Sequence, residues 1–452
     1  MLGKNRVIFP GEKVLLAVSG GPSSCSMLRQ VQEGLSQNAN KKLRFLPGIA
    51  YIDEGAVIGQ SVDERQRTVS ELQALFKATG FPFYILPLEQ VLDLPSSVVA
   101  TAPSPSERPA TAYKAAVDHF VQSDGANLLT QPEELEEKPL PLVQESRTRL
   151  LQQLIGSVNT LTAREDLLNR LRQHLLVHTA RTEGYSKLML GDSCTRLAVK
   201  LLTSISLGRG AQLAQDTGFL DSRYGDIISV RPMRDYSAKE IAYYNHIFSV
   251  PSVVIPSLDT KKTDKASIQR LTEHFVTKLQ ADFPSTVSTI YRTGEKLQNA
   301  CRKSSAGDHC DRCLLCMCTL DTAVEKASAF QATLISDQLS RTKSKGGSST
   351  EIPRQSPGRP ESAAPAGLCC SSAGGLDCGR SARGGGYCSS KVPETTDLKS
   401  LLCYSCTLTV RDMSTVKHLP QYILSEAQRR QSRSQMREEI AEFLLDDHDE
   451  GN

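Results

Sequence analysis

The alternation of short apolar runs with helical segments near the N-terminus restricts the fold of this chain more than any other feature. A β-branched, apolar run over Val14–Val18 ends at a Ser-Gly-Gly turn and is followed by a helix expected to begin near Cys25. A second strand is predicted over 44–55, a helix over 62–79 and a third strand over 81–88. This rhythm predicts an α/β fold, a parallel sheet with helices on both faces.

Composition divides the chain into six parts. An apolar share of 39% without tryptophan is low for a single packed globule, so part of the 452 residues is expected to be linker. We expect the first part of the α/β domain over 1–93, a flexible insertion with short helices over 94–160, and the second part with a helical extension over 161–300. A cysteine-rich segment (301–340), a low-complexity disordered linker (341–398) and a second cysteine pair with a terminal helix (399–452) follow.

The charge and hydropathy of the chain exclude some classes of protein. A formal net charge of +3 does not indicate a nucleic-acid binder, so any basic surface must be local. The sequence contains no run of about eighteen apolar residues and no signal-peptide core. We therefore expect a cytoplasmic protein with no membrane contact. In that reducing compartment the 13 cysteines, several in C-x-x-C pairs, indicate metal binding more than disulfides.

Two C-x-x-C pairs predict a metal site. Together they would supply four thiolates for a tetrahedral zinc ion, with the low-complexity region looped out between them. The four expected ligands are Cys313, Cys316, Cys403 and Cys406. Other cysteines overlap the first pair, so ligation by His309 and Cys310 and an iron–sulfur cluster remain alternatives.

The turn after the first apolar run has the composition of a phosphate-binding loop. Its backbone N–H groups and the positive end of the following helix, which Ser23 or Ser24 could cap, would face a phosphate. The lysine of the G-x-x-x-x-G-K-S/T loop is missing. The alternative is an ordinary strand-to-helix connection in which the glycines serve a tight turn. The residues expected to line a degenerate nucleotide site are Ser19, Gly20, Gly21, Ser23, Ser24 and Asp53.

The loop "SGGPSS" resembles the SGG-x-D-S loop of the PP-loop ATP pyrophosphatases, a superfamily of adenylating enzymes with an adenine nucleotide alpha hydrolase-like fold. Further along the chain, "GDSCTRLA", "RPMRDYSAKEI" and "FPSTVSTIYRTGEKL" resemble, in order, landmarks of the tRNA-thiolating branch of that superfamily. They are most similar to the second-subunit family of the cytosolic thiouridylases. The resemblance covers about residues 1–330 and resumes at Cys403 and Cys406.

This resemblance implies a subunit of the cytoplasmic tRNA thiolation complex, which exchanges the 2-oxygen of the wobble uridine for sulfur in tRNAs for Lys, Glu and Gln. It implies a heterodimer with a catalytic sister subunit that adenylates the uridine. A ubiquitin-like carrier would deliver the sulfur as a thiocarboxylate, and ATP and Mg²⁺ would act through the partner subunit. Because members of the family usually carry a further cysteine-paired segment before the position of Met1, this chain is expected to be a shortened form.

Acidic residues are missing at two places in the family's pattern. Ser23 stands where active PP-loops have Asp, and Thr195 and Arg196 stand where active members carry an acidic pair. Since Mg²⁺ needs oxygen ligands, we expect this subunit to keep the fold without running the chemistry itself. Two alternatives remain. One is a stand-alone ATP-dependent tRNA-modifying enzyme of the lysidine-synthetase or amidotransferase type, and the other is a zinc scaffold that binds no nucleotide.

Five further side chains are candidates for function. Cys25 and Cys194 each lie just inside a predicted helix, where a lowered pKa would favour thiolates able to handle sulfur. The alternative for both thiols is buried packing. Arg209, Arg231 and Arg234 are candidate contacts to tRNA phosphates, and the alternative is that they cap helices or pair with neighbouring carboxylates.

Overall fold

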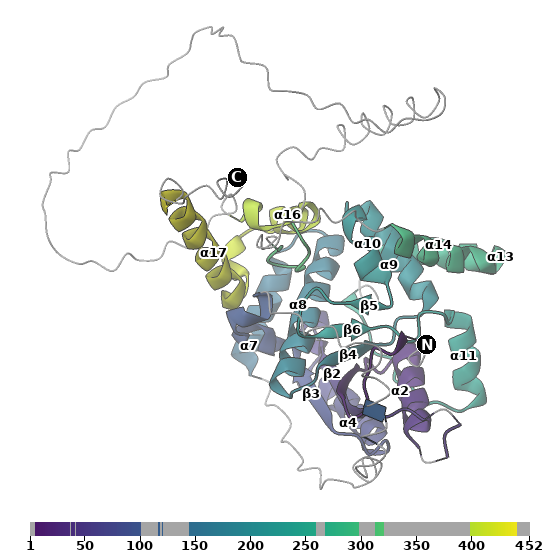
Figure 1. Ribbon diagram of the computed structural model, residues 1–452. Coiled ribbons are helices and arrows are strands. Elements are labelled where there is room, and N and C mark those ends of the chain that lie inside the picture. Colours follow the sequence, from purple (N-terminus) through teal and green to yellow (C-terminus); the bar gives the residue numbers. More distant parts are fainter. Residues whose placement is uncertain are drawn as a thin grey trace, which may run out of the picture. The chain divides into compact units, whose positions relative to one another are not determined.

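The structure is a computed structural model of the whole chain (Figure 1). It describes one compact unit, and the segment that forms a second unit, 325–391, lies outside the described residues. The described residues are 5–36, 38–40, 42–100, 116–117, 120, 144–258, 267–297, 312–320 and 398–440.

A six-stranded sheet forms the centre of this unit. Its strand order is β3-β2-β1-β4-β6-β5, and every pairing is parallel except that of β5 with β6. The predicted parallel sheet is therefore confirmed. The strands are β1 (Lys13–Ala17), β2 (Leu46–Asp53), β3 (Phe83–Pro87), β4 (Lys187–Leu190), β5 (Leu220–Asp221) and β6 (Ile228–Val230).

Helices cover both faces of the sheet (Figure 1). The α-helices are α2 (Pro22–Leu35), α3 (Gly55–Ile58), α4 (Val62–Lys77), α7 (Glu145–Gly156), α8 (Leu161–Thr182), α9 (Cys194–Ser206), α10 (Leu213–Thr217), α11 (Ala238–Ile247), α13 (Ile268–Asp282), α14 (Pro284–Lys296), α16 (Tyr404–Arg411) and α17 (Gln421–Ile440). Short 3-10 helices are η1 (Leu88–Asp93), η2 (Ser96–Val99), η3 (Gly210–Gln212), η5 (Lys399–Leu401) and η6 (Val416–His418).

The side chains of β1 explain how the two faces are held. Val14 and Leu16 pack into the cluster formed with α2, α4 and α11, whereas Leu15 packs into the cluster formed with α7 and α8. All three side chains are completely buried. Because successive residues of a strand point to opposite faces, a strand covered on both sides reads as an unbroken apolar run. That is the pattern observed in the sequence.

The flexible insertion expected over 94–160 is wrong at both of its ends. The turn η2 and the helix α7 pack into the same core as α8 and the sheet. Apolar side chains in these two segments are fully or almost fully buried. The sequence did not indicate this, because the residues nearby are rich in Pro, Ser and acidic side chains. The buried apolar residues are Leu94, Val98, Val99, Leu151, Leu154 and Ile155. The short helix expected around residues 112–121 falls largely outside the described residues.

The C-terminal residues 398–440 return to the sheet unit and pack beside α8 (Figure 1). An isolated β-bridge joins Val158 to Met413. The Nδ1 atom of His174 on α8 lies 2.7 Å from the hydroxyl of Tyr422 on α17. Burial lowers the pKa of His174 to about 4, so this contact forms with a neutral imidazole at physiological pH. The end of the chain is thus part of the main core.

Substitution of Gly48 tests how tightly β2 packs against the connection between α8 and β4, which carries Tyr185. An added Cβ would lie 2.0 Å from the hydroxyl oxygen of Tyr185, which is itself buried. Because β2 is paired on both sides and cannot move, Gly48→Ala is expected to lower the free energy of unfolding by about 1–3 kcal/mol. Gly156→Ala, on α7 with no atom within 4 Å of the added Cβ, should leave it unchanged or slightly raised. Urea unfolding of both variants measures the difference, and equal midpoints would contradict it.

Candidate nucleotide crevice and metal centre

The turns after β1 and β4 meet at the carboxyl edge of the sheet. β2 lies on one side of β1 and β4 on the other, so the strand order reverses direction at this point. A Cβ added at Gly191, the first residue after β4, would lie 3.0 Å from the Cα of Ser24 and 3.2 Å from its backbone nitrogen. Glycine lets the two turns approach this closely, since any other residue would require one of them to shift by a few tenths of an ångström. In open α/β sheets such a switch point is where ligands bind.

The serine-glycine loop has the conformation of a tight strand-to-helix turn. Gly20 adopts φ +79°, a region that favours glycine, and a Cβ there would lie 2.9 Å from a methyl carbon of Leu72. Helix α2 begins at Pro22 instead of near Cys25, and Gly21 precedes it without a side-chain cap. The expected cap by Ser23 or Ser24 is therefore wrong.

The loop is held by contacts from α11 and from the segment that follows it. The backbone N–H of Val253 donates to the carbonyl of Gly20 at 2.9 Å, and the side-chain amide of Asn245 donates to the carbonyl of Pro22 at 3.0 Å. The hydroxyl of Ser24 donates to the carbonyl of Gly21 at 3.0 Å. The loop is thus held in place by contacts within this chain.

The carboxylate at the end of β2 is neutralised. Asp53 is buried, and its oxygens accept from the backbone N–H of Gly55 at 2.9 Å and from Nε of Arg65 at 2.7 Å. The same guanidinium donates to both oxygens of Glu89, which also accepts from the hydroxyl of Thr148. One buried arginine therefore hydrogen-bonds to two buried acids, which share its single positive charge. An acid saturated by an internal arginine is a poor ligand for an external cation.

The carboxylate in the turn after β4 is neutralised as well. Asp192 lies 3.4 Å from Arg231 and 3.9 Å from Arg196. Burial raises the pKa of Asp192, but the charges of Lys200, Arg231 and Arg196 outweigh it, and the pKa falls below its ordinary value. The hydroxyl of Thr195 accepts from the first backbone N–H of α11 at 3.0 Å. Thr195 and Arg196 thus have structural partners at the position where active relatives are expected to carry acids.

The arginines expected to contact tRNA phosphates are buried. Arg209 is 5% exposed and pairs with Asp166 at 2.5 Å. Arg231 is 2% exposed and lies between Asp192 and Asp221, at 3.4 and 3.6 Å. Both guanidinium groups are held inside the protein by carboxylates.

Arg234 is also buried, and its guanidinium carbon stacks 5.3 Å from the ring centre of Tyr291. The expectation that these three arginines contact tRNA is therefore wrong, because a buried cation cannot reach an external phosphate. Their structural alternative, pairing with internal partners, is what the structure shows for Arg209 and Arg231.

The thiols of Cys25 and Cys194 are not activated. Burial raises the pKa of Cys25 to about 11, against a smaller opposing hydrogen bond with Ser24. Burial also raises the pKa of Cys194, against a smaller opposing hydrogen bond with Thr195. The two thiols pack in different apolar clusters, one with β1 and α2 and the other with α13 and α14. The expected lowering of their pKa is wrong, because desolvation dominates over the helix N-terminus.

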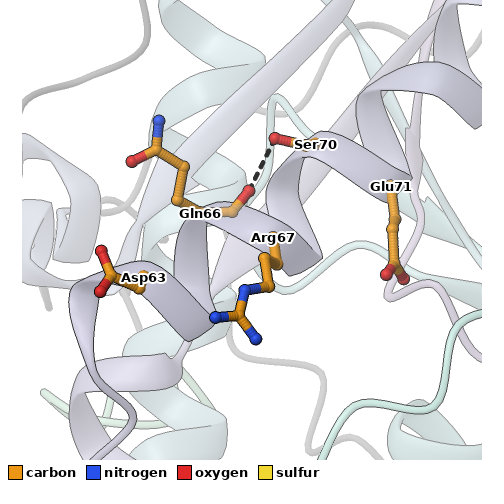
Figure 2. A pocket seen from close by; sticks show the side chains of 5 residues that line it. All are labelled: Asp63, Gln66, Arg67, Ser70 and Glu71. Carbon is orange, nitrogen blue, oxygen red and sulfur yellow. Dashed lines mark hydrogen bonds between the residues drawn. The ribbon is translucent and has the colours of Figure 1, made fainter.

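The hollow drawn in Figure 2 lies elsewhere, on the outer surface of α4. Its lining comes from that single helix, and the only hydrogen bond drawn there is from the hydroxyl of Ser70 to the carbonyl of Gln66 at 2.8 Å. The lining residues are Asp63, Gln66, Arg67, Ser70 and Glu71. Since no second element contributes a polar group, this hollow has no feature of a catalytic site.

The two C-x-x-C pairs come together in the core. The Sγ atoms of four buried or half-buried cysteines all lie within 4.8 Å of one another and could hold a metal ion. They are Cys313, Cys316, Cys403 and Cys406, the set expected from the sequence. The alternative ligands His309 and Cys310 lie outside the described residues. Soft thiolates of this kind select zinc, copper(I) or iron–sulfur centres.

Local backbone structure presents each pair. In the first pair, the N–H of Met317 donates to the carbonyl of Cys313 at 3.0 Å, and Met317 adopts φ +56°. In the second pair, Cys403 precedes α16 and Cys406 lies in its first turn. A hydrogen bond of 3.0 Å from the N–H of Leu314 to the carbonyl of Leu401 joins the two segments. The cluster is thus prearranged by the backbone.

Two important side chains were not identified from the sequence. Arg65 neutralises the candidate residue Asp53, but it is one of many arginines and no local pattern marks its partner. Cys318 lies 3.1 Å, sulfur to sulfur, from Cys316. The sequence shows the C-x-C spacing of Cys316 and Cys318, but the selection of two C-x-x-C pairs assigns no role to Cys318.

Together, the covered switch-point crevice and the distant thiolate cluster define an α/β protein with a nucleotide-binding type of fold and a separate candidate metal centre. Residues 267–408 match the family described as cytoplasmic tRNA 2-thiolation protein 2. The chain is 54% identical over 458 residues to the protein of that name from Danio rerio, covering 99% of this chain and 87% of the relative. For the Homo sapiens protein the identity is 49% over 467 residues, covering 100% and 87%. The chain belongs to the cytoplasmic tRNA 2-thiolation protein 2 family.

Among solved structures, the chain is similar to a U34-tRNA thiolase, NcsA, from Methanococcus maripaludis, solved with its 4Fe–4S cluster. The TM-score is 0.41 at 12% identity, covering 65% of this chain and 73% of the other. The resemblance to the second-subunit family inferred from the sequence motifs is confirmed by the relatives, whose names describe them as cytoplasmic. In the described part of the chain, no helix combines the length and the apolar character needed to cross a bilayer.

Alkylation tests the state of the two buried thiols. With a pKa of about 11 for Cys25, its thiolate is scarce at pH 8, so iodoacetamide should modify it on the order of a hundredfold more slowly in the native protein than in urea. Cys194 should follow the same pattern. Peptide mass spectrometry resolves each site. Native and unfolded rates that agree at either cysteine would contradict the assignment for that thiol.

Proposed function

We propose that this chain is the non-catalytic subunit of the complex that 2-thiolates the wobble uridine of cytoplasmic tRNAs for Lys, Glu and Gln. Membership of the tRNA 2-thiolation family supports the reaction. The observation that carries the division of labour is the pairing of Asp53 with Arg65 and of Asp192 with Arg231. A crevice whose carboxylates are already neutralised offers Mg²⁺–ATP little to bind.

The chemistry then belongs to a sister subunit. In this proposal the sister subunit of a heterodimer adenylates the uridine, since the C2 oxygen is a poor leaving group until it carries AMP. A ubiquitin-like carrier supplies the sulfur as its thiocarboxylate. The contribution of this chain is a rigid α/β unit whose serine-glycine loop is held by its own contacts with Val253 and Asn245.

We also propose that the four-cysteine cluster holds zinc. With Zn–S bonds of about 2.3 Å, ligand sulfurs of a tetrahedral ion lie about 3.8 Å apart. The separation of 3.6 Å between Cys316 and Cys403 and the limit of 4.8 Å for the whole set fit that size. A cubane iron–sulfur cluster would hold the thiolates farther apart, because each of them binds a different iron atom. A closed four-thiolate zinc site is structural, and it would crosslink the two segments that carry the cysteines.

Separate inactivation of the two nucleotide loops tests the division of labour. In the reconstituted heterodimer, Ser24→Ala in this chain should change tRNA thiolation by no more than about twofold, because Ser24 bonds only within its own loop. Substitution of the aspartate in the sister subunit's loop should lower it by at least about 100-fold. Thiolated uridine is quantified by mass spectrometry of digested tRNA.

The purified single chain is the control for a stand-alone enzyme, and it should not hydrolyse ATP above background. ATP turnover that disappears on substitution of Gly20 or Gly21 would overturn the proposal in favour of an ATP-dependent enzyme. Thiolation that persists without any copy of this chain would overturn its role as a required subunit.

Metal analysis tests the zinc centre. The full chain, purified with its partner, should contain about one zinc ion per copy at the cluster, and Cys406→Ser should lose it. Because the cluster lies in the same core as α8, loss of the ion should lower the melting temperature by roughly 5–10 °C. Cys25→Ser is the matched control, a buried cysteine remote from the cluster that should retain the metal. Iron and inorganic sulfide in place of zinc would contradict the identity of the ion.

A further inference from the structure

A fifth thiol lies beside the four-cysteine cluster. Cys318 is 1% exposed, and its Sγ lies 3.1 Å from the Sγ of Cys316. It is not one of the four cysteines whose sulfurs all lie within 4.8 Å of one another, so it is a neighbour of that set and not a member of it. Cys318 therefore borders the cluster on the side of Cys316.

The backbone explains why two cysteines separated by one residue share this side. In an extended strand, residues i and i+2 point the same way, but they are held about 6–7 Å apart. Here Met317 adopts φ +56° and tightens the chain between the two cysteines. The carbonyl of Cys318 accepts from the N–H of Cys313 at 2.8 Å, and a β-bridge pairs Arg312 with Thr319. The loop thus closes on itself and directs both thiols inward.

A tetrahedral ion has four coordination positions, and the pocket offers five sulfurs. A sulfur separation of 3.1 Å is shorter than the spacing of about 3.8 Å between two ligands of one zinc ion. Cys316 and Cys318 are therefore better placed to occupy one coordination position in turn than to bind the same ion together.

We propose that Cys318 is a reserve metal ligand, which takes the coordination position of Cys316 when that thiol is lost or modified. This inference rests on the proposed metal centre. It gives the site a defined asymmetry. The position of Cys316 has a substitute, and the position of Cys406 has none.

The test compares single serine variants in the full chain purified with its partner subunit. Zinc is measured per chain, and the number of thiolates is measured after cadmium exchange from the sulfur-to-cadmium charge-transfer absorption. Cys316→Ser and Cys318→Ser should each keep about one metal ion with a four-thiolate absorption. Cys316→Ser/Cys318→Ser and Cys406→Ser should each lose most of the metal.

The single variants separate this inference from the proposed metal centre. If Cys316→Ser loses as much metal as Cys406→Ser, or keeps it with a three-thiolate absorption, the reserve role is overturned while the metal centre stands. If the unsubstituted protein holds no metal, both are overturned. Both decisive variants are single Cys→Ser changes at buried positions, so a general loss of folding would reduce metal binding in both and would count against the reserve role.

Discussion

The double coverage of β1 is the constraint on which the rest of the structure depends. This strand is paired in parallel on both edges and packed on both faces, so it cannot shift relative to the neighbouring strands and helices. The turn that follows it is consequently fixed against the turn after β4, with Gly191 in close contact with Ser24. The conformation of this turn is therefore set by the core and not by the loop alone.

The charged groups around this crevice pair with one another inside the protein. Each carboxylate at the strand ends has an internal cation, and the arginines that could have served an external polyanion are inside the protein. Buried pairs of this type are costly to break, because removal of one partner leaves the other charge unpaired in a low-dielectric interior. Such a network rigidifies the unit.

The sequence predicted what depends on short-range pattern. The strand β1 and the helix α4 follow from apolar periodicity, and the cysteine set follows from C-x-x-C spacing, since two residues of separation already fix a local geometry. It did not predict contacts between distant residues. Arg209 and Asp166 are separated by 43 positions, and the pairing that buries them has no local signature. Leu151 and Leu154 were missed because surrounding composition outweighed a short helical pattern.

The return of residues 398–440 to α8 has a consequence for the long connection that begins after Leu320. The cysteines on its two sides are anchored by the core, so its ends are held in place whatever lies between them. The described residues on either side of this interval are therefore joined through the cysteine cluster and the core shared with α8, and not through the chain between them alone.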